Sequence, residues 1–305
     1  MGSAHRPPGS TDVGDVGATT SAYVWGLSDR ASFSAECTRC HDGSMGTVVF
    51  FHAHPDDEAL TTGGSMARAA AEGHRVVHVI ATNGELGEAP DALAAGETLV
   101  DRRRAETERS AAILGVHRLE WLGYHDSGMT GWEQNERPDS FWRADVDTAA
   151  TRLVHVLRAE RADVLVAYDW HGGYGHPDHI QVHRVGLRAA ELAGAVRVLE
   201  VTYNRDAILA GMAEPDGDGG PDFDPSGPAD DGNPFGTPEA ELHLAVDVAP
   251  YVTLKHRSIA CHASQVTDTA YFVDMPPAKF ALWFSTEWYI EPDAPPGLRP
   301  GWLFE

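Results

Sequence analysis

Short apolar runs alternate with longer amphipathic stretches over most of the chain, and this alternation limits the fold more than any other feature. Strands that are apolar on both faces and are separated by helices form a parallel sheet covered on both sides. We therefore expect an α/β fold of three Rossmann-like layers, with a mostly parallel sheet and helices on both faces. The expected strands are Thr47–Phe51, Arg75–Ala81, Arg118–Leu122, Val164–Tyr168 and Arg197–Tyr203, and the expected helices between them are Glu58–Glu72, Leu99–Leu114 and Val146–Arg158.

The pattern changes after Tyr203. Residues 212–240 are crowded with Gly, Pro and Asp, so they form either a flexible insertion or an ordered lid, and we expect the flexible insertion. A further strand, a helix and an aromatic-rich closing segment predict a small C-terminal β/α extension, at Leu242–Val248, Val252–Ser264 and Phe280–Ile290. We expect a single domain over residues 45–305, preceded by a disordered N-terminal extension over residues 1–44.

The composition argues against several classes of protein. A formal net charge of −23 repels the phosphates of nucleic acid, so we expect no nucleic-acid partner. No apolar stretch reaches the roughly 20 residues of a membrane helix and the start of the chain lacks a signal-peptide pattern, so we expect a cytoplasmic protein without a membrane span. Cys37–His41 matches the C-x-x-C-H pattern of haem attachment, but that chemistry requires export, so we do not expect haem. The sequence leaves the oligomeric state open.

Two clusters of histidines and carboxylates follow the first and fourth expected strands, at residues 52–58 (HAHPDDE) and 174–179 (YGHPDH). Ligands of an open parallel sheet bind beyond the carboxyl ends of its strands, where the strand order reverses. If these two strands are neighbours, His54, Asp57 and His179 converge on one ion. Two histidines and a carboxylate leave a catalytic zinc one position for water. The same set forms the facial triad of non-haem iron oxygenases, but the neighbouring Asp56 favours hydrolysis.

These motifs resemble those of a known family. Residues 53–58 (AHPDDE), together with residues 175–179 (GHPDH), resemble the PIG-L/LmbE family of zinc-dependent de-N-acetylases, and the likeness extends from about Met45 to Tyr203. Residues 103–106 (RRAE) and 124–129 (YHDSGM) resemble the mycothiol branch of that family. That branch contains the deacetylase of N-acetylglucosaminyl-inositol and the amidase that cleaves mycothiol conjugates.

The resemblance implies a role for each motif residue. His54, Asp57 and His179 would ligate zinc, which agrees with the ligand set expected from the residues alone. Asp56 would be the general base that takes a proton from a zinc-activated water. Glu58 fits a first-turn residue or an outer-shell partner better than a catalytic acid, and His52 fits a packed strand-end histidine better than a fourth ligand.

The remaining motif residues have two readings each. Protonated His176 would supply positive charge to the tetrahedral oxyanion, and Asp178 would either orient His176 or cap the following helix. Tyr174 would donate a hydrogen bond to the same oxygen or gate the site. Arg103 and Asp126 would hold sugar or inositol hydroxyls, or would be a helix-surface charge and a turn residue.

The leading hypothesis is a metal-dependent hydrolase that removes an N-acyl group, an acetyl, from a glucosamine-containing conjugate. The expected cofactor is Zn2+, with Fe2+ accepted by the same ligands, and the expected partner is a small-molecule amino-sugar conjugate. A mycothiol S-conjugate amidase and an antibiotic pseudo-sugar deacetylase share this chemistry and stay open. A non-catalytic sugar-binding protein is the alternative from another class, but Asp56 and His176 argue against it because binding needs neither a base nor an acid. Trp132 and Trp142 would stack on a sugar or pack their loop.

Overall fold

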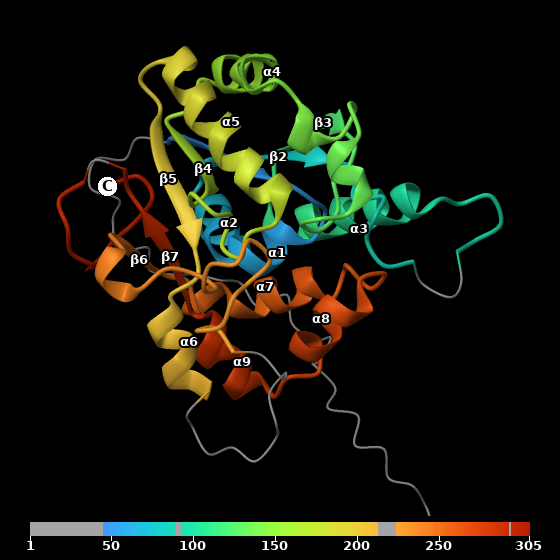
Figure 1. Cartoon of the computed structure of the whole chain (residues 1–305). Helices are drawn as coiled ribbons and strands as arrows, with labels where there is room; N and C mark the ends of the chain where they lie inside the picture. The colour runs from blue at the N-terminus through green and yellow to red at the C-terminus, as the bar shows by residue number, and fades with distance from the viewer. Residues whose placement is uncertain (1–44, 90–92, 213–223, 293) are drawn as a thin grey trace, which may run out of the picture. The chain divides into compact units, whose positions relative to one another are not determined.

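The computed structural model describes residues 45–89, 93–212, 224–292 and 294–305 (Figure 1). All of them fall within one compact unit of the chain, Cys40–Glu305. The N-terminal extension expected over residues 1–44 lies outside the described residues.

A mostly parallel sheet of eight strands forms the centre of this unit, in the order β3-β2-β1-β4-β5-β7-β6-β8. The first five strands in this order pair in parallel, while β7 runs antiparallel to both β5 and β6. The strands are β1 (Thr47–His52), β2 (Arg75–Thr82), β3 (Arg118–Tyr124), β4 (Val164–Tyr168), β5 (Arg197–Thr202), β6 (Leu244–Asp247), β7 (Thr286–Ile290) and β8 (Arg299–Pro300).

Helices cover both faces of the sheet, which confirms the predicted three-layer α/β fold (Figure 1). On one face α4 packs against α5, which also contacts β4 and β1; on the other, α2 contacts β2, α3 and α7. The helices are α1 (Asp57–Thr61), α2 (Gly63–Ala71), α3 (Leu99–Leu114), α4 (Val146–Glu160), α5 (Pro177–Ala193), α6 (Arg205–Met212), α7 (Val252–Ile259), α8 (Val266–Val273) and α9 (Pro277–Phe284). None of the described helices is long and apolar enough to cross a membrane.

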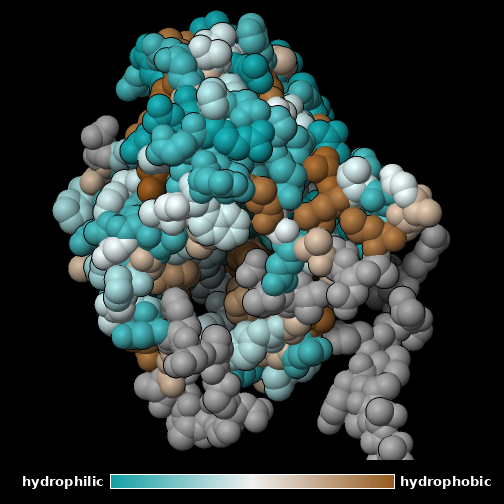
Figure 2. Space-filling model, turned by 45° about the vertical axis from the view of Figure 1, so that its right-hand side comes forward, coloured by the Kyte–Doolittle hydropathy of each residue, from teal (hydrophilic) through white to brown (hydrophobic). Residues whose placement is uncertain are grey.

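The surface agrees with the strongly charged composition. Figure 2 shows one face of the molecule, on which hydrophilic residues cover most of the upper part, where α4 and α5 lie. In the interior, every residue of β4 and all but the first residue of β1 are buried, as strands covered on both faces must be.

The single helix expected over residues 58–72 is divided in two at Thr62. The second part, α2, begins where the Glu287 carboxylate of β7 accepts hydrogen bonds from the backbone N–H groups of Gly64 and Ser65, at 2.8 and 2.9 Å. A carboxylate at this position satisfies free amides and favours a new helix start. The division therefore comes from a strand distant in sequence, which the local pattern does not reveal.

The aromatic-rich segment expected to close the fold is a helix followed by a strand, α9 and β7. β7 pairs with β5 through Val201 and Tyr289 and continues the sheet in the antiparallel direction. This pairing adds β7, β6 and β8 to the parallel half, as the predicted C-terminal β/α extension requires.

The site expected from the sequence depends on β1 lying beside β4. The two strands are neighbours, with Val49 opposite Leu165, and β1 pairs with β2 on its other side. Chain connections therefore diverge between β1 and β4, which is the switch point where open α/β sheets bind ligands. The segments that follow β1 and β4 carry the two histidine motifs to this edge.

Candidate active site

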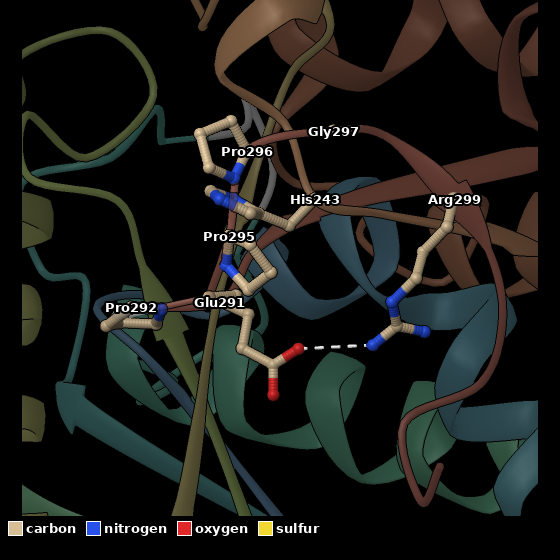
Figure 3. Close-up of a pocket in the computed structure, with 8 residues that line it drawn as sticks. His243, Glu291, Pro292, Pro295, Pro296, Gly297 and Arg299 are labelled. Atoms are coloured by element: carbon tan, nitrogen blue, oxygen red, sulfur yellow. Dashed lines mark hydrogen bonds and ion pairs between the residues drawn. The ribbon is translucent and has the colours of Figure 1, made fainter.

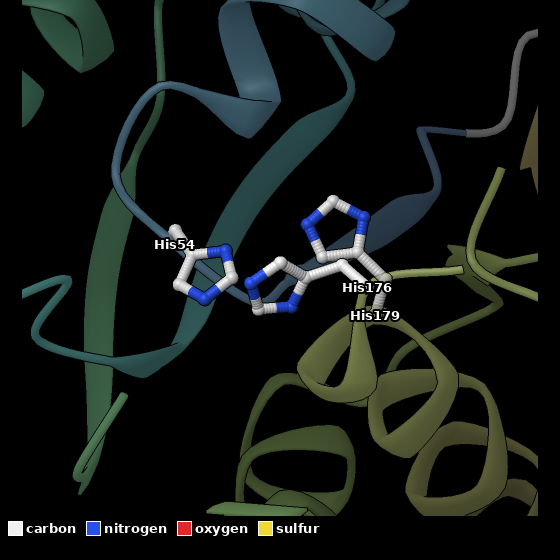
Figure 4. Close-up of side chains that lie close together, drawn as sticks. All are labelled: His54, His176 and His179. Atoms are coloured by element: carbon white, nitrogen blue, oxygen red, sulfur yellow. The ribbon is translucent and has the colours of Figure 1, made fainter. Parts of the chain in front are cut away.

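Three histidines from the two motifs lie together at the switch point. His54 follows β1, whereas His176 and His179 lie at the start of α5, and Figure 4 shows the three imidazoles grouped between these elements. Their ring centroids are 4.6 to 5.3 Å apart, and all three residues are buried. The local sequence explains part of this, because Pro177 suits the first turn of a helix and starts α5 at the second motif.

Asp57 lies between two of these histidines. Its Oδ2 atom is 3.5 Å from Nδ1 of His54, and its Oδ1 atom is 3.4 Å from Nε2 of His179. Burial alone would raise the pKa of Asp57, but the neighbouring imidazoles of His179 and His54 lower it well below the usual value. The carboxylate is therefore ionised, as a metal ligand must be.

His179 is the residue that tests whether the group fits a metal ion. Its Nδ1 atom contacts the carbonyl oxygen of Gly172 at 3.1 Å, while its buried Nε2 atom has no hydrogen-bond partner among the described residues. Buried nitrogens are normally satisfied, and a metal ion satisfies an imidazole lone pair. Gly172, at φ 67°, permits the close approach, because a side chain there would collide with Cβ of His179. The residues present fit a metal.

Two triads of the described residues meet the geometric requirement for a metal. His54, His176 and His179 each offer a ligand atom, and these atoms lie within 4.8 Å of one another; the same holds for His54, Asp126 and Asp178. The expected set with Asp57 is not one of these two triads, and His176 takes the place of Asp57 in the first. The described residues thus form a metal-binding group of histidines and carboxylates, while the exact ligand set stays a prediction.

Asp178 corrects one expectation. Its carboxylate does not contact His176; instead its Oδ2 atom lies 3.2 Å from Nε2 of His54 and accepts from the backbone N–H of Ser127 at 2.9 Å. Its side chain does not cap α5 either. His176 is the cap, because its Nδ1 atom accepts from the backbone N–H of Asp178 at 3.1 Å. A cap formed by His176 leaves the Asp178 carboxylate free to reach across to the first motif.

The charge expected on His176 is also absent. Burial and the neighbouring His54 and His179 lower the pKa of His176 well below the usual value. The imidazole is therefore neutral, and because Nδ1 accepts a hydrogen bond, Nε2 carries the proton. A neutral donor replaces the predicted cation.

Asp56 has a strained backbone. Its φ is 93° and its ψ −30°, a region that residues other than glycine rarely adopt and that costs on the order of 1–3 kcal/mol. It precedes α1 without forming a side-chain cap. Burial raises the pKa of Asp56 to about 6, although the charge of Arg103 opposes this rise. Strain of this kind collects at functional sites, which supports the role expected for this carboxylate.

Arg103 is a buried clamp rather than a helix-surface charge. Only 3% of the residue is exposed, and its Nη2 atom donates to Oδ2 of Asp56 at 3.1 Å and to the carbonyl of Pro55 at 2.5 Å. Nη1 donates to the carbonyl of Gly84 at 2.7 Å. Arg103 thus holds the loop that carries Asp56. Its expected contact with a sugar or inositol hydroxyl stays a prediction.

Asp126 lies inside the site rather than on a solvent-exposed turn. The residue is buried, its Oδ1 atom is 3.6 Å from Nε2 of His54, and the same oxygen accepts from the backbone N–H of Gly128 at 2.8 Å. The protein therefore brings Asp126 and Asp178 to the same nitrogen of His54. Binding of substrate hydroxyls by Asp126 stays a prediction.

Tyr174 is covered by the described part of the 212–240 insertion. Its ring lies edge-on to His179 with centroids 4.9 Å apart, and it stacks with Phe235. The backbone of this segment is hydrogen-bonded to the site loop, from Asp230 N to Tyr174 O at 2.9 Å and from Gly236 N to Gly173 O at 2.7 Å. Residues 224–240 thus cover this loop, and residues 213–223 lie outside the described residues, so the flexible insertion expected over residues 212–240 stays a prediction.

Sequence reasoning missed His262 and Ser127. His262, at the end of the segment that follows α7, contacts Glu58 at 2.8 Å, and Ser127 Oγ hydrogen-bonds Asp178. A lone histidine and a loop serine carry no local signal of such contacts. The two structural interpretations were right: Glu58 lies in the first turn of α1, and His52 packs at the end of β1, 3.1 Å from Oγ1 of Thr62.

A pocket in the C-terminal part of the chain lies apart from these residues (Figure 3). It is bordered by His243 and by the loop before β8, where Arg299 donates to Glu291 at 3.2 Å. None of the residues expected in the site lines this pocket. The pocket is therefore not part of the candidate active site.

A three-layer α/β fold with buried histidines and carboxylates at its switch point defines a metal-binding α/β protein. The sequence profile of the PIG-L family, described as GlcNAc-PI de-N-acetylase, matches residues 49–190. A 1D-myo-inositol 2-acetamido-2-deoxy-alpha-D-glucopyranoside deacetylase from Thermobifida fusca is 41% identical over 239 residues, which cover 72% of this chain and 83% of the relative. The chain belongs to the PIG-L family of de-N-acetylases, and it is a deacetylase, an enzyme that hydrolyses a linear amide.

Two further comparisons distinguish similarity in sequence from similarity in fold alone. A relative of the same name from Streptomyces scabiei is 53% identical over 156 residues, which cover 48% of each chain. GalB, a 4-carboxy-2-hydroxymuconate hydratase from Pseudomonas putida KT2440, shares the fold with a TM-score of 0.52 at 20% identity, over 82% of this chain and 98% of that one. Because a hydratase has this fold, the fold alone does not decide the reaction. The assignment to deacetylases depends on the sequence relatives.

Proposed function

We propose that this protein removes the acetyl group from an N-acetylglucosaminyl conjugate of inositol. The observation that carries the proposal is the position of Asp57, whose two oxygens face Nδ1 of His54 and Nε2 of His179 at 3.5 and 3.4 Å, directly after the buried carboxylate of Asp56. A ligand set beside a separate base is what metal-assisted amide hydrolysis requires. The named activity of the relatives supports the substrate.

His54, Asp57 and His179 would hold a zinc ion. Imidazole and carboxylate donors suit zinc, and Fe2+ is accepted by the same donors. When bound, the ion polarises the amide carbonyl and lowers the pKa of water beside it. Asp178 would orient His54 for this role, because it contacts Nε2 and leaves Nδ1 of that ring on the side of Asp57.

The Asp56 carboxylate would take the proton from the attacking water. Arg103 occupies its Oδ2 atom at 3.1 Å, which leaves Oδ1 for the proton. Because the backbone at this residue is strained and the carboxylate is held by Arg103, its direction is set before substrate binds. The base would later deliver the same proton to the departing amine.

His176 and Tyr174 would stabilise the tetrahedral oxyanion. Neutral His176 carries its proton on Nε2, because Nδ1 accepts from the backbone of Asp178. That N–H is available to donate a hydrogen bond to the developing negative charge. Tyr174, whose ring lies edge-on to His179, would donate a second hydrogen bond from its hydroxyl.

The alternatives with the same chemistry differ only in the acyl group and the sugar conjugate. The activity for which the relatives are named favours the acetyl group and inositol over the amide of a mycothiol S-conjugate or the acyl group of an antibiotic pseudo-sugar. Their being deacetylases removes the support for a sugar-binding protein without catalysis.

A substrate panel tests the proposal. The purified chain, loaded with zinc, is incubated with N-acetylglucosaminyl-inositol, with a bulky mycothiol S-conjugate and with free N-acetylglucosamine, and released amine and acetate are quantified. We expect acetate from the inositol conjugate at the highest kcat/KM. Cleavage of the S-conjugate alone would assign the chain to the amidases and would contradict the proposal.

A further inference from the structure

The carboxylate of Glu58 joins the loop of Asp56 to a distant part of the chain. Its Oε2 atom accepts from the backbone N–H of Asp56 at 3.1 Å. Its Oε1 atom accepts from Nε2 of His262 at 2.8 Å and from Oγ of Ser110 at 2.5 Å. Glu58, His262 and Ser110 are all buried, so water does not compete for these contacts.

These contacts bear on the strained conformation of Asp56. The residue has φ 93° and forms no side-chain cap to α1. Its carbonyl oxygen accepts from the backbone of α1, at Ala59 and Leu60, whereas its N–H and its carboxylate contact side chains. Glu58 holds its N–H, and Arg103 holds its carboxylate. One contact sets the backbone and the other sets the side chain, so both are needed to fix the direction of Oδ1.

His262 and Ser110 in turn hold Glu58. Two donors on Oε1 favour the rotamer in which Oε2 reaches Asp56, and Oγ of Ser110 is itself 2.6 Å from Oγ of Ser258. Ser258 and His262 lie in or just after α7, well beyond residue 190, where the family profile ends. The support for the base is therefore supplied from a part of the chain outside the matched region.

We propose that Glu58 and His262 are positioning residues for the hydrolytic step, which act by holding the backbone N–H of Asp56 and thereby aiming its carboxylate. The proposal rests on the proposed function, in which Asp56 is the base. Neither residue is assigned contact with the substrate or the metal. The buried pair of Glu58 and His262 contributes to the reaction only through Asp56. A pair that merely stabilises the fold would not act on the reaction through this residue.

A double-mutant cycle on the full, zinc-loaded chain tests this directly. We compare wild type, His262→Ala, Asp56→Asn and the double variant. For each protein we measure kcat, KM and zinc content, and where turnover is slow we follow the reaction under single-turnover conditions. Loss of a supporting partner typically lowers activity about 10–100-fold, and we expect this fall in kcat for His262→Ala with KM and zinc content within about twofold of wild type. In the Asp56→Asn background we expect no further loss, because the group being aimed has gone.

Two variants control for loosening of the segment. His262→Gln keeps a donor near the position of Nε2 and should recover most of the lost kcat. Ser264→Ala removes a buried hydrogen bond of the same segment, but to Glu106 rather than to Glu58, and should leave kcat at the wild-type value. If His262→Ala does not fold, Ser110→Ala removes the other donor to the same oxygen and takes its place in the cycle, with a smaller expected loss.

Several results would overturn the proposal. One is a wild-type kcat in His262→Ala. Another is a further loss of kcat in the Asp56→Asn background as large as the loss that His262→Ala causes in wild type. A third is a fall in the kcat of Ser264→Ala as large as that of His262→Ala. Failure of the proposed function is recognised separately, because the wild-type enzyme would then release no acetate from the inositol conjugate. Wild-type activity in Asp56→Asn would remove the base and the positioning role together.

Discussion

The carboxylate of Asp178 contacts His54 rather than His176: its Oδ2 atom lies 3.2 Å from Nε2 of His54, although the two residues come from different motifs. The contact places a carboxylate against Nε2 of His54, while Nδ1 of the same ring faces Oδ2 of Asp57 at 3.5 Å. This contact links the segment after β1 to the segment after β4. In the sequence, by contrast, Asp178 lies close to His176.

This contact predicts that Asp178→Asn weakens metal binding. The amide is a poorer acceptor than the carboxylate and does not stabilise the required tautomer as well, so the zinc affinity should fall about 10–100-fold. Competition with a fluorescent chelator measures this. Asp147→Asn, at an exposed position on α4, is the control and should bind zinc as wild type does. A wild-type affinity in Asp178→Asn would show that this contact does not orient His54.

His179→Ala should abolish stoichiometric zinc binding. The substitution removes the buried Nε2 atom that has no hydrogen-bond partner among the described residues and leaves too few ligands at the position of Asp57. Atomic emission on dialysed protein gives the zinc content directly. His155→Ala, exposed on α4, serves as the matched histidine control. One zinc per chain in both variants would exclude His179 from the ligand set.

Gly172→Ala should damage both stability and metal binding. The residue has φ 67°, and a methyl group there would collide with His179, so we expect a loss of roughly 1–2 kcal/mol from the backbone alone and a displaced ligand besides. Gly73→Ala carries a similar backbone penalty at φ 89° but meets no atom within 4 Å. Urea unfolding and zinc titration of the pair separate the two effects. Equal zinc affinity in both variants would contradict the close packing at His179.

Glu160 predicts part of the acid sensitivity of the fold. Hydrogen bonds from Arg75 and Arg118 lower the pKa of Glu160 from 4.5 to about 2, with burial acting in the opposite direction. A lowered folded-state pKa contributes stability above the unfolded pKa, and this contribution is lost as the pH falls from about 4.5 toward 2. The unfolding free energy of Glu160→Gln, followed by urea titration at each pH, should therefore decline less steeply than that of wild type in this window. Exposed Glu241→Gln is the control, and parallel curves for wild type and Glu160→Gln would disprove the assignment.

The sequence was sufficient to predict the sheet and the meeting of the two motifs. Both motifs follow strands that are apolar on both faces, and such strands lie at the centre of a parallel sheet, so His54, Asp57 and His179 were expected to share one edge if the two strands are neighbours, as they are. The charge of His176 and the partner of Asp178 could not be predicted in this way. They depend on which of several close polar groups reaches which atom once the segments are packed.

Contacts between distant segments explain the other differences. One of the two interpretations of Arg103 was a helix-surface charge, yet the residue is buried and donates to the carbonyls of Pro55 and Gly84. The composition of residues 212–240 favoured a flexible insertion over an ordered lid, and in the described part, residues 224–240, backbone hydrogen bonds join the segment to the loop of Tyr174. Amino-acid composition describes the side chains of a segment. The burial of Arg103 and the backbone hydrogen bonds of residues 224–240 depend instead on segments that are distant in the sequence.

The most direct test of the account is the Asp56→Asn variant on N-acetylglucosaminyl-inositol, with zinc content measured on the same sample. Asparagine nearly preserves the shape of the side chain and its contact with Arg103 but does not take a proton at the working pH. We predict full zinc content, a KM close to that of wild type and a kcat lowered by about 100- to 10,000-fold, the range that a general base contributes. A variant that retains zinc and turns over at the wild-type rate would contradict the assignment of Asp56 as the base.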